Sequence, residues 1–176
     1  MEYFDVYDIN RKKTGKIIKR GDRLQKGEYH LFVQVWIMNS DGLFLSEQRS
    51  KNKTYPLVWC ASGGNAIVGE DGLACAIREI KEELGIDIRE YDGGLFDSRV
   101  YEEDNQSYFC DSFLYYIDKP AEEYIIQREE IEKVEYKSMD EIRQLMKENK
   151  YFVYDEDYLS YLEEKSKEIR NKKSAF

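Results

Sequence analysis

The order of the predicted secondary structure indicates a mixed α/β fold. Strand-like segments come first, an amphipathic helix follows them, and further strands and two helices complete the chain. This order differs from the regular strand–helix alternation of a doubly wound sheet. The chain has 176 residues, 41% hydrophobic and 36% charged, which suits a globular domain with its own core. We therefore expect one domain over residues 1–176, with the first strand and the last helix as extensions.

Strands are predicted for most of the first half of the chain. Residues 3–7 alternate between two faces, and residues 10–15 are typical of a turn. Residues 30–38 are rich in strand-forming apolar side chains and predict a central strand. The Asn-Ser-Asp-Gly sequence at 39–42 indicates a hairpin turn, so residues 43–49 are expected to return as the next strand.

The second half combines strands with two helices. Ser138 and Glu141 have the spacing of a capping box, which predicts a helix over residues 139–147. Strands are predicted over residues 94–101, 107–117 and 131–136, with an acidic turn at 102–105, a last helix over 156–170 and a frayed tail over 171–176.

The segment from Gly64 to Ile86 predicts an amphipathic helix with an acidic face. Asp71 is positioned to cap this helix, and glycines precede it. Glu79, Glu82 and Glu83 are spaced i, i+3 and i+4, so they share one face. The opposite, apolar face is predicted to contain Leu73, Ile77, Ile80 and Leu84.

Three neighbouring carboxylates can form a metal site or an ordinary solvated surface. Like charges raise one another's pKa unless a cation neutralises them. Hard divalent cations such as Mg²⁺ and Mn²⁺ prefer oxygen ligands and could do this. From the carboxylates alone, the solvated surface is the commoner interpretation, so the spacing of the whole segment decides between them.

That spacing resembles the Nudix box: Gly, five residues, Glu, seven residues, Arg-Glu, a bulky aliphatic, any residue, Glu-Glu, any residue, Gly and a bulky aliphatic. All nine fixed positions are filled without a gap, by Gly64, Glu70, Arg78, Glu79, Ile80, Glu82, Glu83, Gly85 and Ile86. The resemblance implies a Nudix-type α/β/α sandwich around a mixed β-sheet. It also implies a hydrolase that cleaves a diphosphate bond in a nucleoside-diphosphate-X or another small pyrophosphate substrate, with Mg²⁺ or Mn²⁺ as cofactor.

The resemblance also assigns roles to individual residues. It implies that Glu79 and Glu83 are metal ligands, and that Glu82 is a further ligand or handles the proton of the attacking water. The backbone carbonyl of Gly63 is implied as another ligand. Arg78 and Glu70 are expected to form a buried structural pair. An acid outside the box is also expected, with Glu129 and Glu130 as the candidates and Glu102 and Glu103 behind them.

Two other functions stay open at this point. The flanking sequences resemble the branch of the superfamily near isopentenyl-diphosphate isomerase, which implies proton-transfer chemistry. Cys60 directly follows Trp59, which is early for the cysteine of that enzyme, and Asn65 occupies a position where a histidine would be expected. A non-catalytic ligand-binding Nudix domain is the third interpretation, although such relatives usually lose box glutamates.

Composition and charge narrow the choice of partners. The formal charge of −9 disfavours a nucleic-acid polymer but is compatible with a small phosphorylated substrate when a metal bridges the negative charges. Residues 11–26 carry eight basic side chains and one acid, which predicts either a solvated surface or a basic rim for phosphates.

The remaining features indicate a location and an assembly. No apolar run is long enough to cross a membrane, and the first ten residues lack the apolar core of a signal peptide. The three cysteines have no paired spacing. We therefore expect a cytoplasmic protein without a membrane-spanning segment or a membrane partner, and the resemblance makes a homodimer possible. His30, the only histidine, is expected to be structural, and Trp59 to lie in the core.

Overall fold

The computed structural model describes residues 1–102, 106–153 and 155–174. Its helices are α1 (Gly72–Leu84), α2 (Met139–Lys147) and α3 (Glu156–Ser174), with short 3₁₀ turns at Ile88–Glu90 and Ala121–Glu123. Its strands are β1 (Tyr3–Tyr7), β2 (Lys13–Lys19), β3 (His30–Met38), β4 (Phe44–Arg49), β5 (Trp59–Cys60), β6 (Ser62–Asn65), β7 (Asp92–Tyr101), β8 (Tyr108–Tyr116), β9 (Ile131–Lys137) and β10 (Tyr151–Phe152).

The larger sheet is mixed and is organised around β3. Its main path runs β10-β5-β4-β3-β8-β7, while β6 also pairs with β3 and β9 with β4. β8 runs parallel to β3 along its whole length, whereas β6 pairs with it antiparallel near the N-terminal half. β3 meets β4 only at its C-terminal end, where Met38 pairs with Phe44. The sheet therefore opens between β6 and β4 on one side of β3.

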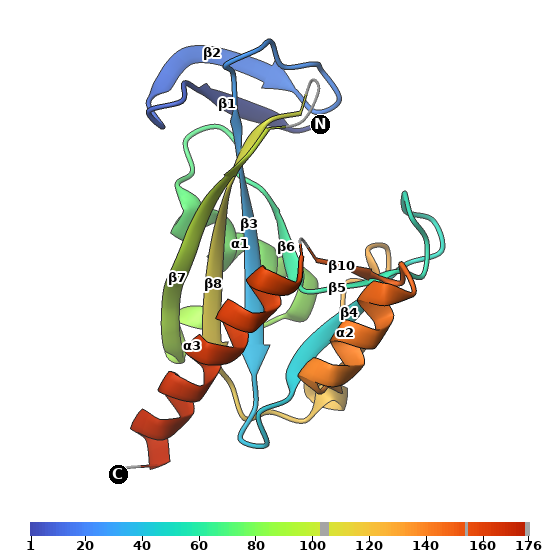
Figure 1. Ribbon diagram of the computed structural model, residues 1–176. Coiled ribbons are helices and arrows are strands. Elements are labelled where there is room, and N and C mark those ends of the chain that lie inside the picture. The colour runs from blue at the N-terminus through green and yellow to red at the C-terminus, as the bar shows by residue number, and fades with distance from the viewer. Residues whose placement is uncertain (103–105, 154, 175–176) are drawn as a thin grey trace.

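Helices cover both faces of this sheet (Figure 1). Odd-numbered residues of β3 pack with α1 in a core that includes Val33, Ile80 and Leu84. Even-numbered residues near its C-terminal end pack on the other side, where Trp36 joins Tyr158 of α3. This arrangement is the α/β/α sandwich around a mixed sheet that the sequence led us to expect.

The N-terminal strands form a separate two-stranded hairpin beside the start of β3. β1 pairs antiparallel with β2, and a small apolar cluster holds Phe4, Val6, Ile18 and Leu24. A backbone bridge joins Tyr7 to Tyr29. In Figure 1 the hairpin lies at one end of the sheet, far from α2. It is well placed to form one wall of a cavity at that end.

Most predicted elements are confirmed, and the differences have local causes. The turn predicted over residues 10–15 is shorter, because β2 already begins at Lys13 and pairs with β1. β7 begins at Asp92 instead of residue 94, and α3 continues to Ser174 instead of ending at residue 170. Residues 175–176 of the expected frayed tail lie outside the described residues. Leu73, predicted in the apolar face of α1, is 48% exposed, because it lies in the first turn of the helix.

Several smaller predictions also have clear outcomes. Trp59 is buried, as expected for a core residue, and Ser138 and Glu141 form the predicted capping box. The three cysteines are buried, and none forms a disulfide. No helix in the described part of the chain is long and apolar enough to span a membrane.

Candidate active site

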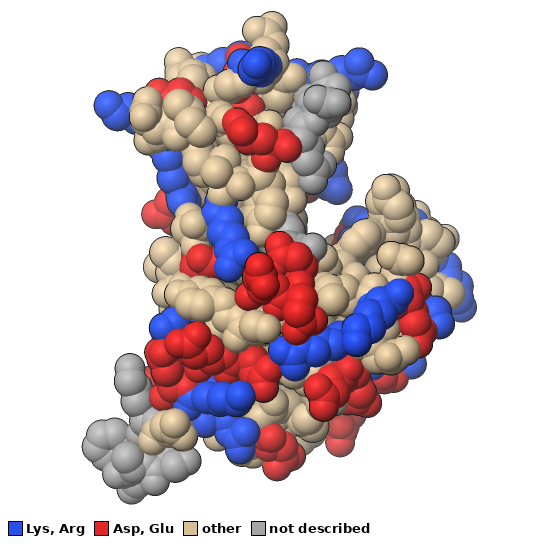
Figure 2. Space-filling view, viewed as in Figure 1, with Lys and Arg blue, Asp and Glu red and all other residues tan. Residues whose placement is uncertain are grey.

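A cavity of about 840 Å³ lies where the hairpin, the start of β3, β6 and the acidic face of α1 come together. In Figure 2 the molecule is hollowed on the side between the β1–β2 hairpin and the part that carries β5 and β10. The cavity is lined by Glu79, Glu82 and Glu83 from α1, by Gly63 from β6 and by Glu47 from β4. All the box carboxylates named from the sequence as metal ligands therefore reach one space.

The ends of α1 are fixed by the residues that the sequence pattern singled out. Asp71 accepts a hydrogen bond from the Ala74 backbone N–H at 2.8 Å, which satisfies one of the free amides at the helix start. Gly85 ends the helix with a φ of 71°, a left-handed conformation that glycine adopts without a steric penalty. Ile80 and Leu84 are fully buried, so their packing fixes how the acidic face is presented to the cavity.

Two glycines of β6 let the carboxylates approach the sheet. Gly63 has a φ of 153° and pairs with Gln34 of β3, so a side chain here would overlap the backbone of Val33. A Cβ on Gly64 would overlap the Glu79 carboxylate. The space that a side chain would fill at Gly64 is thus occupied by a functional group of the box.

Glu83 and Glu47 form a pair of buried acids at this edge. Their relative exposures are 8% and 7%. Burial, and then the Glu47 charge, raise the pKa of Glu83 well above its usual range, while a hydrogen bond from the Gly63 backbone acts in the opposite direction. Burial raises the pKa of Glu47 to about 7, although hydrogen bonds from Ser62 and Cys60 favour its charged form. The Oε2 atom of Glu83 is buried without a hydrogen-bond partner among the described residues.

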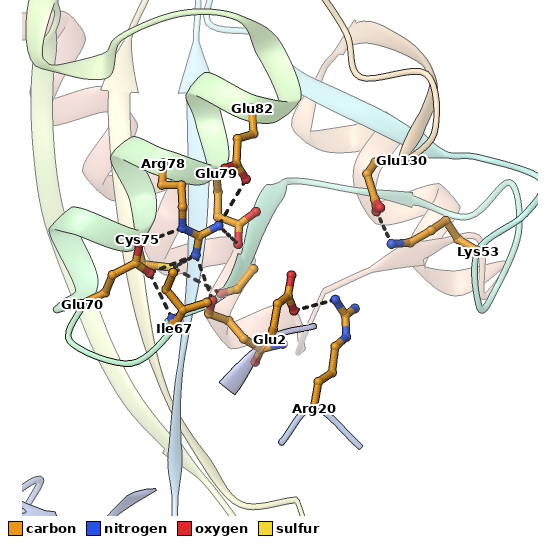
Figure 3. A network of polar contacts seen from close by, with 12 residues as sticks. Glu2, Arg20, Lys53, Ile67, Glu70, Cys75, Arg78, Glu79, Glu82 and Glu130 are labelled. Carbon is orange, nitrogen blue, oxygen red and sulfur yellow. Dashed lines mark hydrogen bonds and ion pairs between the residues drawn. The ribbon is translucent and has the colours of Figure 1, made fainter. Parts of the chain in front are cut away.

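Arg78 gathers the other acids of the box around one guanidinium (Figure 3). It donates to both carboxylate oxygens of Glu70, at 2.7 and 2.9 Å, and to the Asn65 carbonyl at 3.1 Å. Arg78 and Glu70 therefore form the structural pair expected from the sequence, although 23% of the Arg78 side chain is exposed. Arg78 also donates to Glu79 at 2.9 Å and to Glu82 at 3.3 Å.

The box carboxylates are close but not arranged as a finished metal site. Within residues 1–102, 106–153 and 155–174, no group of three His, Cys, Asp or Glu side chains is positioned to hold a metal ion as it stands. Glu79 and Glu82 are instead turned to Arg78. The chemistry of the site nevertheless fits a divalent cation, because burying two adjacent acids and an unpaired carboxylate oxygen is unfavourable without a neutralising partner.

The acids proposed outside the box have different positions. Glu130 lines the cavity and pairs with Lys53, as Figure 3 shows, whereas Glu129 is exposed. Glu102 accepts a hydrogen bond from the Tyr29 hydroxyl at 2.5 Å and does not line the cavity. Glu103 lies outside the described residues.

Glu47 is the acid that the sequence reasoning missed. It follows two apolar residues and a serine in β4, and nothing in that local pattern distinguishes it from a polar residue at the end of a strand. The pairing of Glu47 with Cys60 turns its side chain toward Ser62 and the box. Predicting that Glu47 belongs to the site would have required knowledge of the register between β4 and β5.

Part of the basic segment also reaches the cavity. Lys19 and Arg20 line it, and Arg20 pairs with Glu2 at 2.8 Å. Lys53 and Arg49 line it from the other side. Figure 3 shows the Glu2–Arg20 and Lys53–Glu130 pairs facing the space in front of the box carboxylates. The cavity therefore has acids on one wall and cations near its rim.

Comparisons with known proteins agree with this geometry. The NUDIX domain family model matches residues 28–156. An uncharacterized Nudix hydrolase of Listeria monocytogenes is 32% identical over 156 residues, covering 88% of this chain and 90% of the relative. Nudix hydrolase 3 of Arabidopsis thaliana is 31% identical over 86% of this chain, although the match covers 21% of that longer protein.

Solved structures support the fold. A Deinococcus radiodurans protein has a TM-score of 0.75 at 19% identity, covering 95% of this chain and 98% of that one. An Ap4A hydrolase of C. elegans has a TM-score of 0.63 at 19% identity, covering 81% and 98%. With a family match over most of its length and a box whose residues converge on one cavity, the chain belongs to the Nudix family and is a Nudix hydrolase, a pyrophosphate-cleaving enzyme.

Proposed function

We propose that this hydrolase depends on a divalent metal and cleaves a diphosphate bond in a nucleoside-diphosphate-X or another small pyrophosphate substrate. The observation that carries the proposal is the buried pair Glu83 and Glu47, with an unpartnered Glu83 oxygen among the described residues, at the edge of a large cavity. Two buried carboxylates with raised pKa values form a site where charge neutralisation by Mg²⁺ or Mn²⁺ is favourable.

The residues that would hold the cation are those of the box. Glu79 and Glu83 are the proposed ligands, with the carbonyl of Gly63, and Glu82 is a further ligand or a proton acceptor. A bound divalent cation supplies charge neutralisation on the phosphates and a more acidic water. Arg78 keeps Glu79 and Glu82 oriented through hydrogen bonds at 2.9 and 3.3 Å.

Glu47 is suited to the proton transfer that hydrolysis requires. A water oxygen forms a bond to one phosphorus, the bond from that phosphorus to the bridging oxygen breaks, and the electron pair leaves with the second phosphate. The attacking water must give up a proton, and a base with a pKa near the working pH accepts it most efficiently. Glu47 lines the cavity beside the proposed ligand Glu83, and burial raises the pKa of its carboxyl in the metal-free protein, which makes it a candidate base alongside Glu82.

The cations at the rim would bind the substrate's phosphates. Lys53, Arg20 and Arg49 line the cavity from two sides, and Arg20 is 59% exposed at its side chain. Binding requires each paired cation to exchange a carboxylate for a phosphate, which carries more negative charge. Such local positive charge allows a protein of net charge −9 to receive an anionic substrate.

An isomerase is the second candidate, because a cysteine and an acid meet in the same cavity. The Cys60 sulfur lies 3.5 Å from a Glu47 carboxylate oxygen, and both residues line the cavity. Protonation and deprotonation of an isoprenoid diphosphate would need such a pair. Burial raises the pKa of the Cys60 thiol well above its usual value, so little of it is ionised at neutral pH, which favours the hydrolase.

A substrate panel with Mg²⁺ or Mn²⁺ tests the proposal. It contains nucleoside triphosphates, ADP-ribose, dinucleoside polyphosphates, nucleotide sugars and isopentenyl diphosphate, and is scored for released phosphate, nucleoside monophosphate and isomerised product. We expect metal-dependent cleavage of one class and none with EDTA. Isomerisation without cleavage would favour the second candidate. Metal binding without turnover would favour a non-catalytic binding domain.

Matched variants connect the activity to the box. Glu83→Gln keeps the shape of the side chain and removes its charge, so turnover should fall by about two or more orders of magnitude with the fold retained. Glu129→Gln is the control, since this acid is exposed and does not line the cavity. Equal turnover of the two variants would contradict the assignment of Glu83.

A further inference from the structure

One wall of the cavity is aromatic. Along β3 the side chains alternate, so that Leu31 and Val33 enter the core beneath α1 while His30 and Phe32 line the cavity. β8 runs parallel to β3 with His30 opposite Tyr108, and Tyr108 lines the cavity as well. Strand register therefore places these three rings side by side along the cavity.

The rings form a continuous surface. His30 and Tyr108 have centroids 5.5 Å apart, and Phe32 meets Tyr108 edge-on at 6.1 Å. Phe4 of the hairpin stacks on His30 at 6.0 Å, and Tyr101 of β7 stacks on Tyr108 at 5.2 Å. Phe4 is held in place by the buried apolar cluster of the hairpin, so it bounds the aromatic wall on the side of the hairpin.

This wall differs from the rest of the cavity in charge. Burial lowers the pKa of His30, so its imidazole is neutral at physiological pH and is not a phosphate-binding cation. Phe32 and Tyr108 are half-buried. Half-buried aromatic rings offer little to phosphates, but they offer stacking to a flat, uncharged ring.

An amide lies next to the wall. Asn65 of β6 is opposite Phe32 in the antiparallel register, and it also lines the cavity. Its Oδ1 atom is buried without a hydrogen-bond partner among the described residues, while its backbone carbonyl is held by Arg78. A rotation of the side chain would let this carboxamide pair with the polar edge of a planar ligand, since an amide has both a donor and an acceptor.

We infer that Phe32 and Tyr108 stack the base of a nucleoside substrate and that the Asn65 amide hydrogen-bonds with the edge of that base. The inference rests on the proposed function and narrows it to nucleoside-containing pyrophosphates. It also gives the hairpin a role, since Phe4 supports the wall from a segment that precedes the NUDIX-matched residues 28–156. Phe32, Tyr108 and Asn65 are specificity residues and are distinct from the proposed metal ligands.

Equilibrium binding tests the inference without requiring turnover. The 5′-monophosphates of adenosine, guanosine, cytidine and uridine are titrated against the full chain in Mg²⁺ by calorimetry, and ribose 5-phosphate serves as the ligand without a base. At least one nucleotide should bind about tenfold tighter than ribose 5-phosphate. Phe32→Leu should weaken that nucleotide by about fivefold or more, as expected for lost stacking, and leave ribose 5-phosphate unchanged.

Controls separate the wall from other effects. Tyr55→Leu alters an exposed aromatic residue that does not line the cavity, and should leave the preference for a base unchanged. Tyr108→Leu repeats the test if Phe32→Leu does not fold, and Asn65→Ala should reduce only the binding of nucleotides. Equal binding of ribose 5-phosphate and every nucleotide would overturn the inference. So would a base preference that persists in both the Phe32 and Tyr108 variants.

The two proposals fail in different ways. Cleavage of pyrophosphates without any base preference would overturn the base site and leave the hydrolase intact. Base-selective binding that is lost in Phe32→Leu, without cleavage of any substrate in the panel, would overturn the proposed function and leave the base site intact.

Discussion

Replacing Glu47 with glutamine should make the metal-free protein less sensitive to pH. Burial raises the pKa of this carboxyl from near 4.5 to about 7 in the folded chain. Each pKa unit corresponds to about 1.4 kcal/mol, so ionising Glu47 in the folded state costs about 3 kcal/mol. A glutamine side chain at this position would carry no charge and would keep an oxygen to accept the hydrogen bond from Ser62, which is 3.0 Å long in the wild type.

The sign of the effect follows from proton binding. Below about pH 4 the Glu47 carboxyl is protonated in both the folded and the unfolded chain, so the free energy of unfolding does not depend on it. Between about pH 4.5 and 7 the unfolded chain loses this proton while the folded chain keeps it, so stability falls as pH rises. Above about pH 7 the carboxyl is ionised in both states, and the folded chain has lost all the stability that depended on keeping it protonated. The Glu47→Gln variant has no ionisable group at this position, so its free energy of unfolding should not fall in this way as the pH rises.

Urea denaturation in EDTA at pH 5 and pH 8 measures the difference. The wild type should lose about 2.5 kcal/mol more than Glu47→Gln between these conditions, because part of the effect is already present at pH 5. Glu129→Gln, which removes an exposed acid, should follow the wild type. The same fall in stability for Glu47→Gln and the wild type would refute the account of a buried, destabilised acid at the edge of the cavity.

Two further substitutions test the architecture of the box. Arg78→Ala removes a half-buried guanidinium with several carboxylate partners, so it should lower stability by about 3 kcal/mol and also reduce activity, measured by thermal melting and turnover. Arg89→Ala, which breaks an exposed pair, should lower stability far less, and equal losses would count against the structural role of Arg78. Gly64→Ala should displace the Glu79 carboxylate and cut turnover about tenfold or more with little change in melting temperature, because the flexible side chain can move aside. Gly94→Ala, whose added Cβ has nothing within 4 Å, is its control, and unchanged turnover of Gly64→Ala would contradict the proposed need for that space.

The sequence identified the box well because its signals are local. Asp71 caps α1, Gly85 ends it, and Arg78 meets Glu70, since all of these contacts are set by spacing along one loop and one helix. The helix signal was less accurate at its first turn, where Leu73 is exposed. Periodicity alone does not tell which turn of a helix has a partner to pack against.

The residues that the sequence missed depend on contacts between distant strands. Glu47 reaches the box only because β4 pairs with β5, and Phe32 joins Tyr108 only because β8 returns parallel to β3. With 15 tyrosines and 8 phenylalanines in the chain, no local pattern selects the ring that lines a cavity. Register between non-adjacent strands supplies that information, and a single sequence does not encode it in any short motif.

Titration with a metal ion is the most direct test of whether the acids of the box form the metal site. Mn²⁺ is titrated into the wild type, Glu83→Gln and Glu129→Gln, and the free ion is followed by electron paramagnetic resonance. We expect the wild type and Glu129→Gln to bind Mn²⁺ with the same affinity and Glu83→Gln to bind it about tenfold or more weakly, because a buried carboxylate ligand has lost its charge. Equal affinity of Glu83→Gln and the wild type would contradict the assignment of the box acids as the metal site.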